Sequence, residues 1–240
     1  MIKLIQKIFT LLNWILGFND PKIGLGEPYR FYFLLKLKKF EKSWNLIDIG
    51  AFRGEFSRTF SRHLRLKTLT LVEPNPVLGA NLRELFPSAK LVQSPIWPIE
   101  TDLIVTEHNK NPGQNFYTTV LGDSQKRVLR SVTLTEILNS VDTSHHTFVK
   151  IDIEGAEIDL IINLEDKLRE SVSVYHLEIS SRTSVDDPLT ILNKLFPNDF
   201  KFFRETRFGM ILINRESFHW SDREKYFQNI ILINTRYISI

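Results

Sequence analysis

Two apolar runs in this sequence end in acidic residues that are followed by glycine. The first run, Leu46–Ile49, contains Asp48 and breaks at Gly50 and Gly54. Apolar residues then recur at helical spacing from Phe56 onward. This order predicts a buried strand, a tight loop and a helix. Glycine allows a left-handed backbone and a close approach of another molecule, so the loop is a candidate cradle for a small ligand.

The residue types in this loop indicate which ligand it suits. A dinucleotide fingerprint beginning at Gly50 needs small residues at two positions where this chain has Phe52 and Glu55. Asp48 would repel a phosphate and attract a cationic or amino-bearing ligand. S-adenosylmethionine, which carries an ammonium and a sulfonium but no phosphate, is such a ligand.

A second acid lies at the separation expected for a ribose contact. The apolar run Leu69–Val72 predicts a buried strand, and Glu73 follows it 23 residues after Gly50. We expect Glu73 to accept hydrogen bonds from both ribose hydroxyls. Asn75 then predicts a helix cap, with Pro76 in the first turn. Either piece alone would fit any α/β protein, but together they favour a cofactor site.

A later apolar run, Thr147–Ile151, predicts another buried strand, which is followed by Asp152, Glu154 and Gly155. Helical spacing then predicts one helix over Ile158–Leu168. In an extended segment, residues two apart point the same way, so the two acids would share one face.

Parallel strands of an open sheet end along one edge, which is where such folds bind ligands. The acids predicted at this edge are Asp48, Glu73, Asp152 and Glu154. So many carboxylates around one crevice are costly without a cation or a polar ligand to meet them. We therefore expect this edge to bind a ligand.

Length and composition limit the classes of protein and the kinds of site that this chain can form. The 240 residues are 42% hydrophobic and 25% charged, which fits one globular domain with an extension. The absence of cysteine excludes a disulfide scaffold, a zinc–thiolate site and a thiol nucleophile. The pair His145–His146 precedes a strand and lies away from the predicted crevice, so we interpret it as a loop feature and predict no metal site.

The positive charge is concentrated at the N-terminus. Residues 1–43 contain eight Lys and Arg and three Asp and Glu, a net charge of +5, which leaves about −2 for the rest of the net +3. A nucleic-acid partner for the main domain is therefore not expected. An amphipathic helix is predicted within residues 1–18, and it could pack on the domain, join a homodimer or contact a membrane surface peripherally. We expect a cytoplasmic protein.

With these segments in hand, the chain resembles the FkbM-type S-adenosylmethionine-dependent methyltransferases. The matching segments are Asp48–Ala51 with Gly54 and Ser57, Glu73–Asn75, Thr133–Leu134 and Lys150–Glu157. The resemblance implies a Rossmann-like fold and methylation of a hydroxyl on a sugar, glycan or small natural product.

By this resemblance, the first segment holds the methionine end of the cofactor and Glu73 holds its ribose. The implied cofactor-binding residues are Asp48, Gly50, Ala51, Gly54, Ser57, Glu73 and Asn75. Family members usually have Asn where this chain has Phe52, which is a departure on the substrate side of the loop.

The predicted fold is α/β, a Rossmann-like class I methyltransferase with a mostly parallel, doubly wound sheet. Segments 201–204 and 210–214 predict an antiparallel C-terminal strand pair, and 230–240 predicts a terminal strand. We divide the chain into an N-terminal helical extension, residues 1–43, and a methyltransferase domain, residues 44–240.

Transfer of a methyl group to a hydroxyl calls for in-line attack and for a base that takes the hydroxyl proton. The catalytic candidates are Asp152, Glu154 and His108, and His108 lies in a polar loop that is either a solvated connection or an acceptor-binding segment. Two alternatives stay open. One is a nucleotide-dependent oxidoreductase on the same sheet, and the other is a non-catalytic binding or membrane-associated scaffold.

Overall fold

The computed structural model describes residues 37, 42–106, 116–118, 127–142, 144–153, 155–179, 187–206, 209–215 and 228–239. Three of the predicted features lie outside these residues: nearly all of the N-terminal extension, the polar loop with His108, and Glu154. None of the described helices is long and apolar enough to cross a bilayer.

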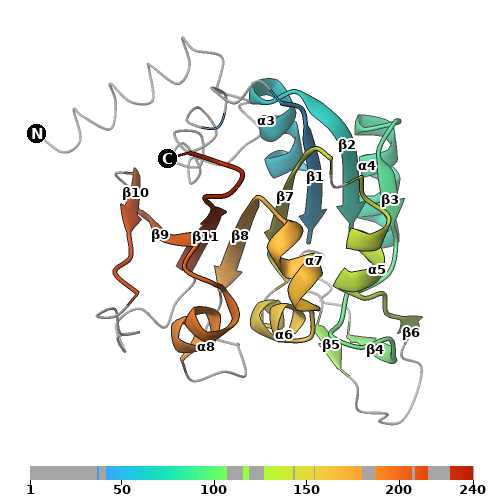
Figure 1. Cartoon of the computed structure of the whole chain (residues 1–240). Coiled ribbons are helices and arrows are strands. Elements are labelled where there is room, and N and C mark those ends of the chain that lie inside the picture. Colours follow the sequence, from blue (N-terminus) through green and yellow to red (C-terminus); the bar gives the residue numbers. More distant parts are fainter. Residues whose placement is uncertain are drawn as a thin grey trace, which may run out of the picture.

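An eight-stranded sheet forms the centre of the molecule (Figure 1). In spatial order its strands are β10 (Gly209–Leu212), β9 (Phe200–Thr206), β11 (Gln228–Asn234), β8 (Val174–Ile179), β7 (His146–Ile151), β1 (Trp44–Ile49), β2 (Leu66–Val72) and β3 (Lys90–Val92). The strands from β8 to β3 are parallel, whereas β11 is antiparallel to both of its neighbours and β10 is antiparallel to β9. This arrangement confirms the predicted fold class and the antiparallel C-terminal pair.

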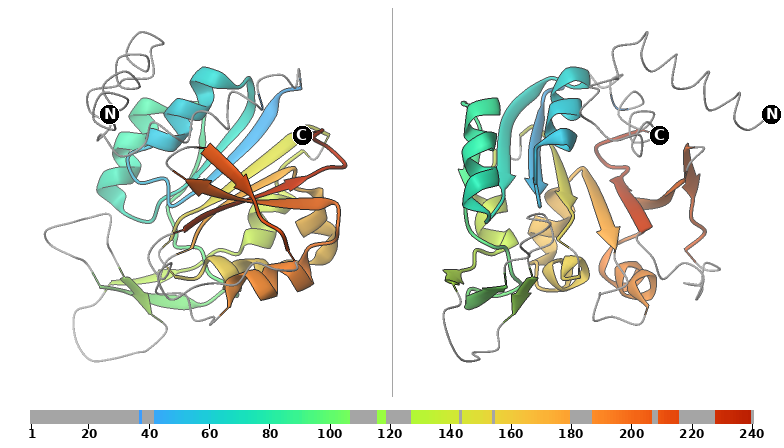
Figure 2. Two further views of the ribbon diagram at one scale, coloured as in Figure 1. Left: turned by 90° about the vertical axis from the view of Figure 1, so that its left-hand side faces the viewer. Right: turned by 180° about the vertical axis from the view of Figure 1, so that it is seen from behind.

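Helices cover both faces of the sheet (Figures 1 and 2). One face carries α3 (Glu55–His63) and α4 (Pro76–Leu85), and the other carries α5 (Leu134–Asn139), α6 (Glu157–Ile162), α7 (Asp166–Ser171) and α8 (Pro188–Leu195). Alternation along β1 supplies both cores, because Leu46 packs with Phe60 of α3 while Ile47 packs with Ile161 of α6.

A small second sheet lies beyond the carboxyl ends of β1, β2 and β3 (Figure 1). It consists of β4 (Asp102–Thr106) between β5 (Phe116–Thr118) and β6 (Arg127–Arg130), all antiparallel. The sequence alone predicts a short strand over Leu103–Thr106, within β4, but it does not predict the partners β5 and β6.

The structure differs from two other expectations. The predicted helix over Ile158–Leu168 is two helices, α6 and α7, which are separated at Asn163; the Asn163 side chain bonds back to the Asp159 carbonyl at 2.8 Å and competes with the helix backbone. The terminal strand ends at Asn234 and inserts between β8 and β9. It is apolar on both faces, which is the composition of an interior strand.

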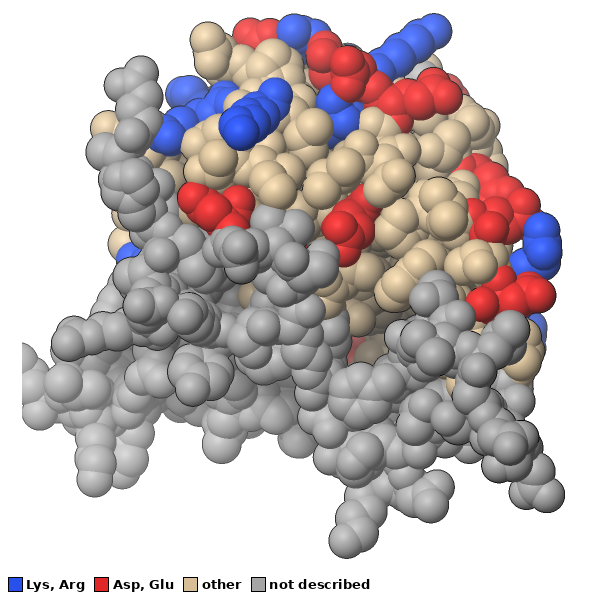
Figure 3. Space-filling view, turned by 90° about the horizontal axis from the view of Figure 1, so that it is seen from below, with Lys and Arg blue, Asp and Glu red and all other residues tan. Residues whose placement is uncertain are grey.

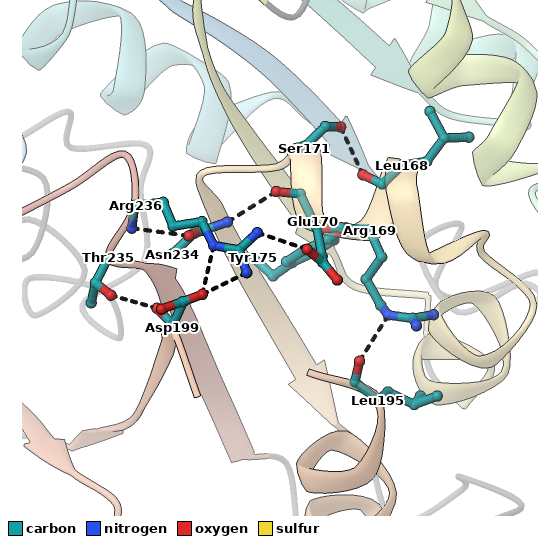
Figure 4. A network of polar contacts seen from close by, with 10 residues as sticks. All are labelled: Leu168, Arg169, Glu170, Ser171, Tyr175, Leu195, Asp199, Asn234, Thr235 and Arg236. Atoms are coloured by element: carbon teal, nitrogen blue, oxygen red, sulfur yellow. Dashed lines mark hydrogen bonds and ion pairs between the residues drawn. The ribbon is translucent and has the colours of Figure 1, made fainter. Parts of the chain in front are cut away.

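A buried arginine holds α6, α7 and α8 together (Figure 4). Arg169 of α7 is 4% exposed, and it donates to the carbonyls of Leu164 at 2.7 Å and Leu195 at 3.2 Å. These carbonyls belong to the ends of α6 and α8, where backbone acceptors lack helical partners. On the surface beside it, Arg236 pairs with Glu170 and Asp199 at 2.7 and 2.6 Å.

We expect Arg169→Met to lower the free energy of unfolding by about 3 kcal/mol, because it leaves buried carbonyls without a donor. The matched change Arg236→Gln removes only exposed pairs and should cost far less. Chemical denaturation of the two variants measures the difference. Equal losses would contradict the bracing role of Arg169.

Candidate active site

The site lies at the edge of the sheet where β1, β2 and β7 end. The Gly50 and Ala51 amides donate to the Val72 carbonyl at 3.0 and 3.1 Å, and the Asp152 amide donates to the Ile49 carbonyl at 3.1 Å. These bonds fix the three segments that follow the strands. Figure 3 looks onto this edge and shows acidic side chains in and beside a hollow in the described surface.

A buried lysine joins the ends of β1 and β7. Asp48 and Lys150 are directly opposite in the parallel register, so their side chains share the face that α3 covers. The Lys150 ammonium lies 3.3 Å from Asp48, 3.1 Å from Asp152 and 3.2 Å from the Gly50 carbonyl oxygen. One cation therefore contacts two of the predicted site acids and the glycine loop.

Burial separates the roles of these two acids. Asp48 is fully buried; its Oδ2 accepts a 2.6 Å hydrogen bond from Ser57, and its Oδ1 faces Lys150 without a well-aligned hydrogen bond. The Asp152 side chain is 27% exposed and is the member of the cluster that solvent or a ligand can reach. The predicted cofactor contacts of Asp48 and Ser57 stay predictions, and the geometry gives both residues a bond inside the protein.

From the sequence, the acids were expected to need a cation or a polar ligand, and Lys150 supplies a cation from within the protein. The sequence does contain a signal for this contact, because a lysine inside the apolar run Phe148–Ile151 must find a buried partner. The described acids Asp48, Asp152 and Glu73 still outnumber Lys150, so the edge keeps negative charge for a ligand.

Both glycines of the loop are required by the protein's own packing. Gly50 and Gly54 have φ of 74° and 76°, values that residues with a Cβ rarely adopt. A Cβ at Gly50 would lie 1.9 Å from the Asp152 carbonyl oxygen, and one at Gly54 would lie 2.7 Å from the Phe86 ring. That side of each glycine is thus filled by protein, and their contact with a cofactor stays a prediction.

Phe52 also has a left-handed backbone, with φ of 50°. This conformation costs a residue with a Cβ roughly 1–2 kcal/mol and is better tolerated by Asn. The Phe52 amide donates to Glu73 at 3.0 Å, and the Arg53 guanidinium lies 5.0 Å from the centre of the Phe52 ring. The hydrogen bond helps to hold the strained residue in place.

Glu73 closes the second corner of the site. Its two carboxylate oxygens accept hydrogen bonds from the amides of Asn75 at 2.9 Å and Phe52 at 3.0 Å, and Glu73 as a whole is 7% exposed. Burial raises the pKa of Glu73 to about 7 despite these bonds. The Asn75 side chain accepts the Val77 and Leu78 amides, which confirms that it caps α4.

Glu157 orders the loop that carries Asp152. It is fully buried at the start of α6, and it accepts the Gly155 amide at 2.9 Å and the Ile153 amide at 3.2 Å. Burial raises its pKa to about 7. The sequence motif contained this residue without revealing its role, although an acid in the first turn of a helix is a general signal for such a contact.

The two adjacent histidines lie at the opposite edge, as predicted. His146 begins β7 and packs on Trp44 with ring centres 4.9 Å apart, while His145 contacts Ser43 and Asp142. Within the described residues, no three His, Cys, Asp or Glu side chains gather in a group that could hold a metal ion.

We expect Lys150→Met to lower the free energy of unfolding by about 3–5 kcal/mol, because it leaves the buried Asp48 carboxylate without a cation. The double variant Asp48→Asn/Lys150→Met removes both sides of the buried pair and should recover a large part of this loss. Denaturant unfolding of both proteins, with Asp48→Asn alone, completes the cycle. Additive losses would contradict a direct interaction between the two side chains.

The sequence model of the methyltransferase FkbM domain matches residues 48–234. A comparison with curated proteins finds no significant match. Among solved structures, the chain is similar to an FkbM methyltransferase from Methylobacillus flagellatus, with 13% identity, a TM-score of 0.49, and coverage of 79% of this chain and 43% of that one. The chain thus spans less than half of that protein.

Two further similarities are of the same order. The precorrin-6y C5,15-methyltransferase from Geobacter metallireducens shows 14% identity, a TM-score of 0.40, and coverage of 84% of this chain and 85% of that one. The O-methyltransferase from Bacillus cereus in complex with SAH shows 10% identity, a TM-score of 0.44, and coverage of 95% and 88%. The assignment rests on the sequence model, which covers more than half of the chain. The chain therefore belongs to the methyltransferase FkbM family.

Proposed function

We propose that this protein methylates a hydroxyl group of a sugar, glycan or other small natural product. The observation that carries the proposal is the partly exposed Asp152 carboxylate, which is held by Lys150 beside the Gly50 loop. A hydroxyl must lose its proton when it accepts a methyl group, and a positioned carboxylate can take that proton. We propose both the class of acceptor and methylation on oxygen rather than on nitrogen or carbon.

The residues at the edge suit the cofactor of the family. S-adenosylmethionine supplies an electrophilic methyl group on a positively charged sulfur. The carboxylates of Asp48 and Asp152 face one cation, Lys150, and Glu73 adds negative charge above about pH 7, so the combined charge favours a ligand with net positive charge. Glu73 keeps lone pairs beyond its two amide contacts and can accept ribose hydroxyls, which is the role that its place after β2 suggests.

Lys150 acts as a positioning residue in this proposal. The Asp152 carboxylate lies just after the end of β7, and its contact with Lys150 restrains it there. The contact of Lys150 with the Gly50 carbonyl fixes the neighbouring loop. Proton transfer requires the carboxylate to be placed to within a few tenths of an ångström, so a restrained carboxylate accepts the proton more effectively than a mobile one. Glu154 and His108 stay catalytic candidates from the sequence alone.

We expect Asp152→Asn to lower the rate of methyl transfer about 10²- to 10⁴-fold, because the variant cannot accept the hydroxyl proton. The matched change Asp142→Asn, at the opposite edge, should leave the rate unchanged. The assay incubates each protein with labelled S-adenosylmethionine and a mixed glycan and lipid extract, and mass analysis identifies the methylated product. Full activity of Asp152→Asn would exclude Asp152 as the base, and products methylated only on nitrogen or carbon would contradict the proposed acceptor.

The raised pKa of Glu73 generates a second prediction. Because burial moves the pKa of Glu73 and of Glu157 from 4.5 to about 7, the folded protein holds protons that the unfolded chain has released in this range. The free energy of unfolding should therefore fall as the pH rises from 4.5 to 7 and become level above it. Glu73→Gln and Glu157→Gln should each flatten part of this slope in denaturant unfolding measured across that range.

Cofactor binding distinguishes the two glutamates. If Glu73 accepts ribose hydroxyls, its ionised form binds better, and the affinity of the wild type should rise roughly tenfold as the pH passes through about 7. Glu73→Gln should lose this rise, whereas Glu157→Gln should keep it. Calorimetric titration of the three proteins with S-adenosylmethionine gives the comparison. Protonation of the cofactor itself changes with pH in the same way in all three experiments. The same rise in Glu73→Gln would contradict the ribose role.

A further inference from the structure

A hollow of ≈ 490 Å³ lies at the amino edge of the sheet, opposite the candidate active site. Its lining comes from three separate segments: the residues before β1, the turn after α3 together with the start of β2, and the loop before β7. The lining residues are Lys42, Ser43, Arg65, Leu66, Lys67, Ser144 and His145. No carboxylate is among them.

The three segments are tied together beneath the hollow. Asn45 is fully buried, and its side chain donates to the Asp142 carbonyl at 2.7 Å and accepts the Thr68 hydroxyl at 2.8 Å. The Trp44 amide donates to the Arg65 carbonyl at 2.8 Å. The backbone that carries the lining side chains is therefore fixed, although the lysine and arginine side chains themselves reach solvent.

The cations of the hollow have no counter-ion in contact among the described residues. In the part of the chain that the structure describes, the side chains of Lys42, Arg65 and Lys67 make no hydrogen bond and no ion pair. Asp142 lies beside the hollow, but its carboxylate accepts the Ser144 amide at 2.9 Å and approaches His145 at 3.7 Å. Asp142, which interacts electrostatically with Lys67 and His145, is thus one acid beside three cations, and His145 adds a positive charge when it is protonated.

Like charges gathered at one place are destabilising unless an anion meets them. The opposite edge provides the contrast, because there the acids surround Lys150. We propose that the hollow at the amino edge binds a phosphate-bearing anion. This inference does not depend on the chemistry at the carboxyl edge.

Phosphate is the anion that this lining suits. A phosphate group presents several acceptor oxygens, which can take separate donors from the lysines and from the planar Arg65 guanidinium. The Ser43 hydroxyl lies 3.0 Å from the His145 ring and adds a polar group to the wall. The volume falls within the range of small-molecule sites.

The phosphate can belong to a free compound or to an anionic lipid headgroup. The chain enters the domain beside the hollow at Lys42, after an N-terminal segment that is also basic, since residues 1–43 carry a net charge of +5. A membrane surface would meet both features, whereas a free compound would need only the hollow. Binding measurements with a soluble phosphate compound and with lipid vesicles separate these two sources.

The test uses the full chain and two matched double variants. Lys42→Gln/Lys67→Gln removes two charges from the hollow, and Lys167→Gln/Lys194→Gln removes two exposed charges from α7 and α8. Each protein is titrated calorimetrically with sodium pyrophosphate at low salt. Each protein is also sedimented with vesicles of phosphatidylglycerol in phosphatidylcholine and with vesicles of phosphatidylcholine alone. Arg65→Gln is a third variant that removes the guanidinium.

We expect Lys42→Gln/Lys67→Gln and Arg65→Gln to weaken anion binding about tenfold or more, while Lys167→Gln/Lys194→Gln binds like the wild type. Loss of pyrophosphate binding assigns a free phosphate compound to the hollow. Loss confined to the phosphatidylglycerol vesicles assigns a lipid headgroup. The proposal is overturned if the wild type binds neither probe, or if both double variants weaken binding equally.

Discussion

The contact of Lys150 with Asp48 and Asp152 is the interaction on which the rest of the site depends. It places a cation where the strands β1 and β7 end, and it also reaches the Gly50 carbonyl of the loop between them. Burial makes the pairing necessary, since an isolated charge in that position would be very costly. The same contact restrains Asp152, whose carboxylate is the part of the cluster open to a ligand.

Charged side chains are neutralised differently at the two edges of the sheet. At the carboxyl edge, acids gather around an internal lysine, and two buried glutamates, Glu73 and Glu157, bind the backbone amides of the loops. At the amino edge, cations gather without comparable partners among the described residues. The carboxyl edge is only partly balanced by Lys150 and keeps negative charge, whereas the amino edge is left positive, so the two edges favour ligands of opposite charge.

Much of the fold followed from the sequence because its signals are local. Buried parallel strands are continuous apolar runs, and the helix cap at Asn75 depends on neighbouring residues. The site acids at β1, β2 and β7 could be placed on one edge for the same reason. What could not be predicted depends on contacts distant in sequence: Lys150 beside Asp48, Gly50 against the Asp152 carbonyl, and the partners of β4. The break between α6 and α7 was missed because the apolar spacing continues across it.

A crystal structure of the protein with S-adenosylhomocysteine tests the central claim most directly. We predict the ligand at the ends of β1, β2 and β7, with its ribose hydroxyls within hydrogen-bond distance of Glu73 and its sulfur facing Asp152. A ligand bound elsewhere, or bound at this edge with Glu73 and Asp152 both out of reach, would contradict the account.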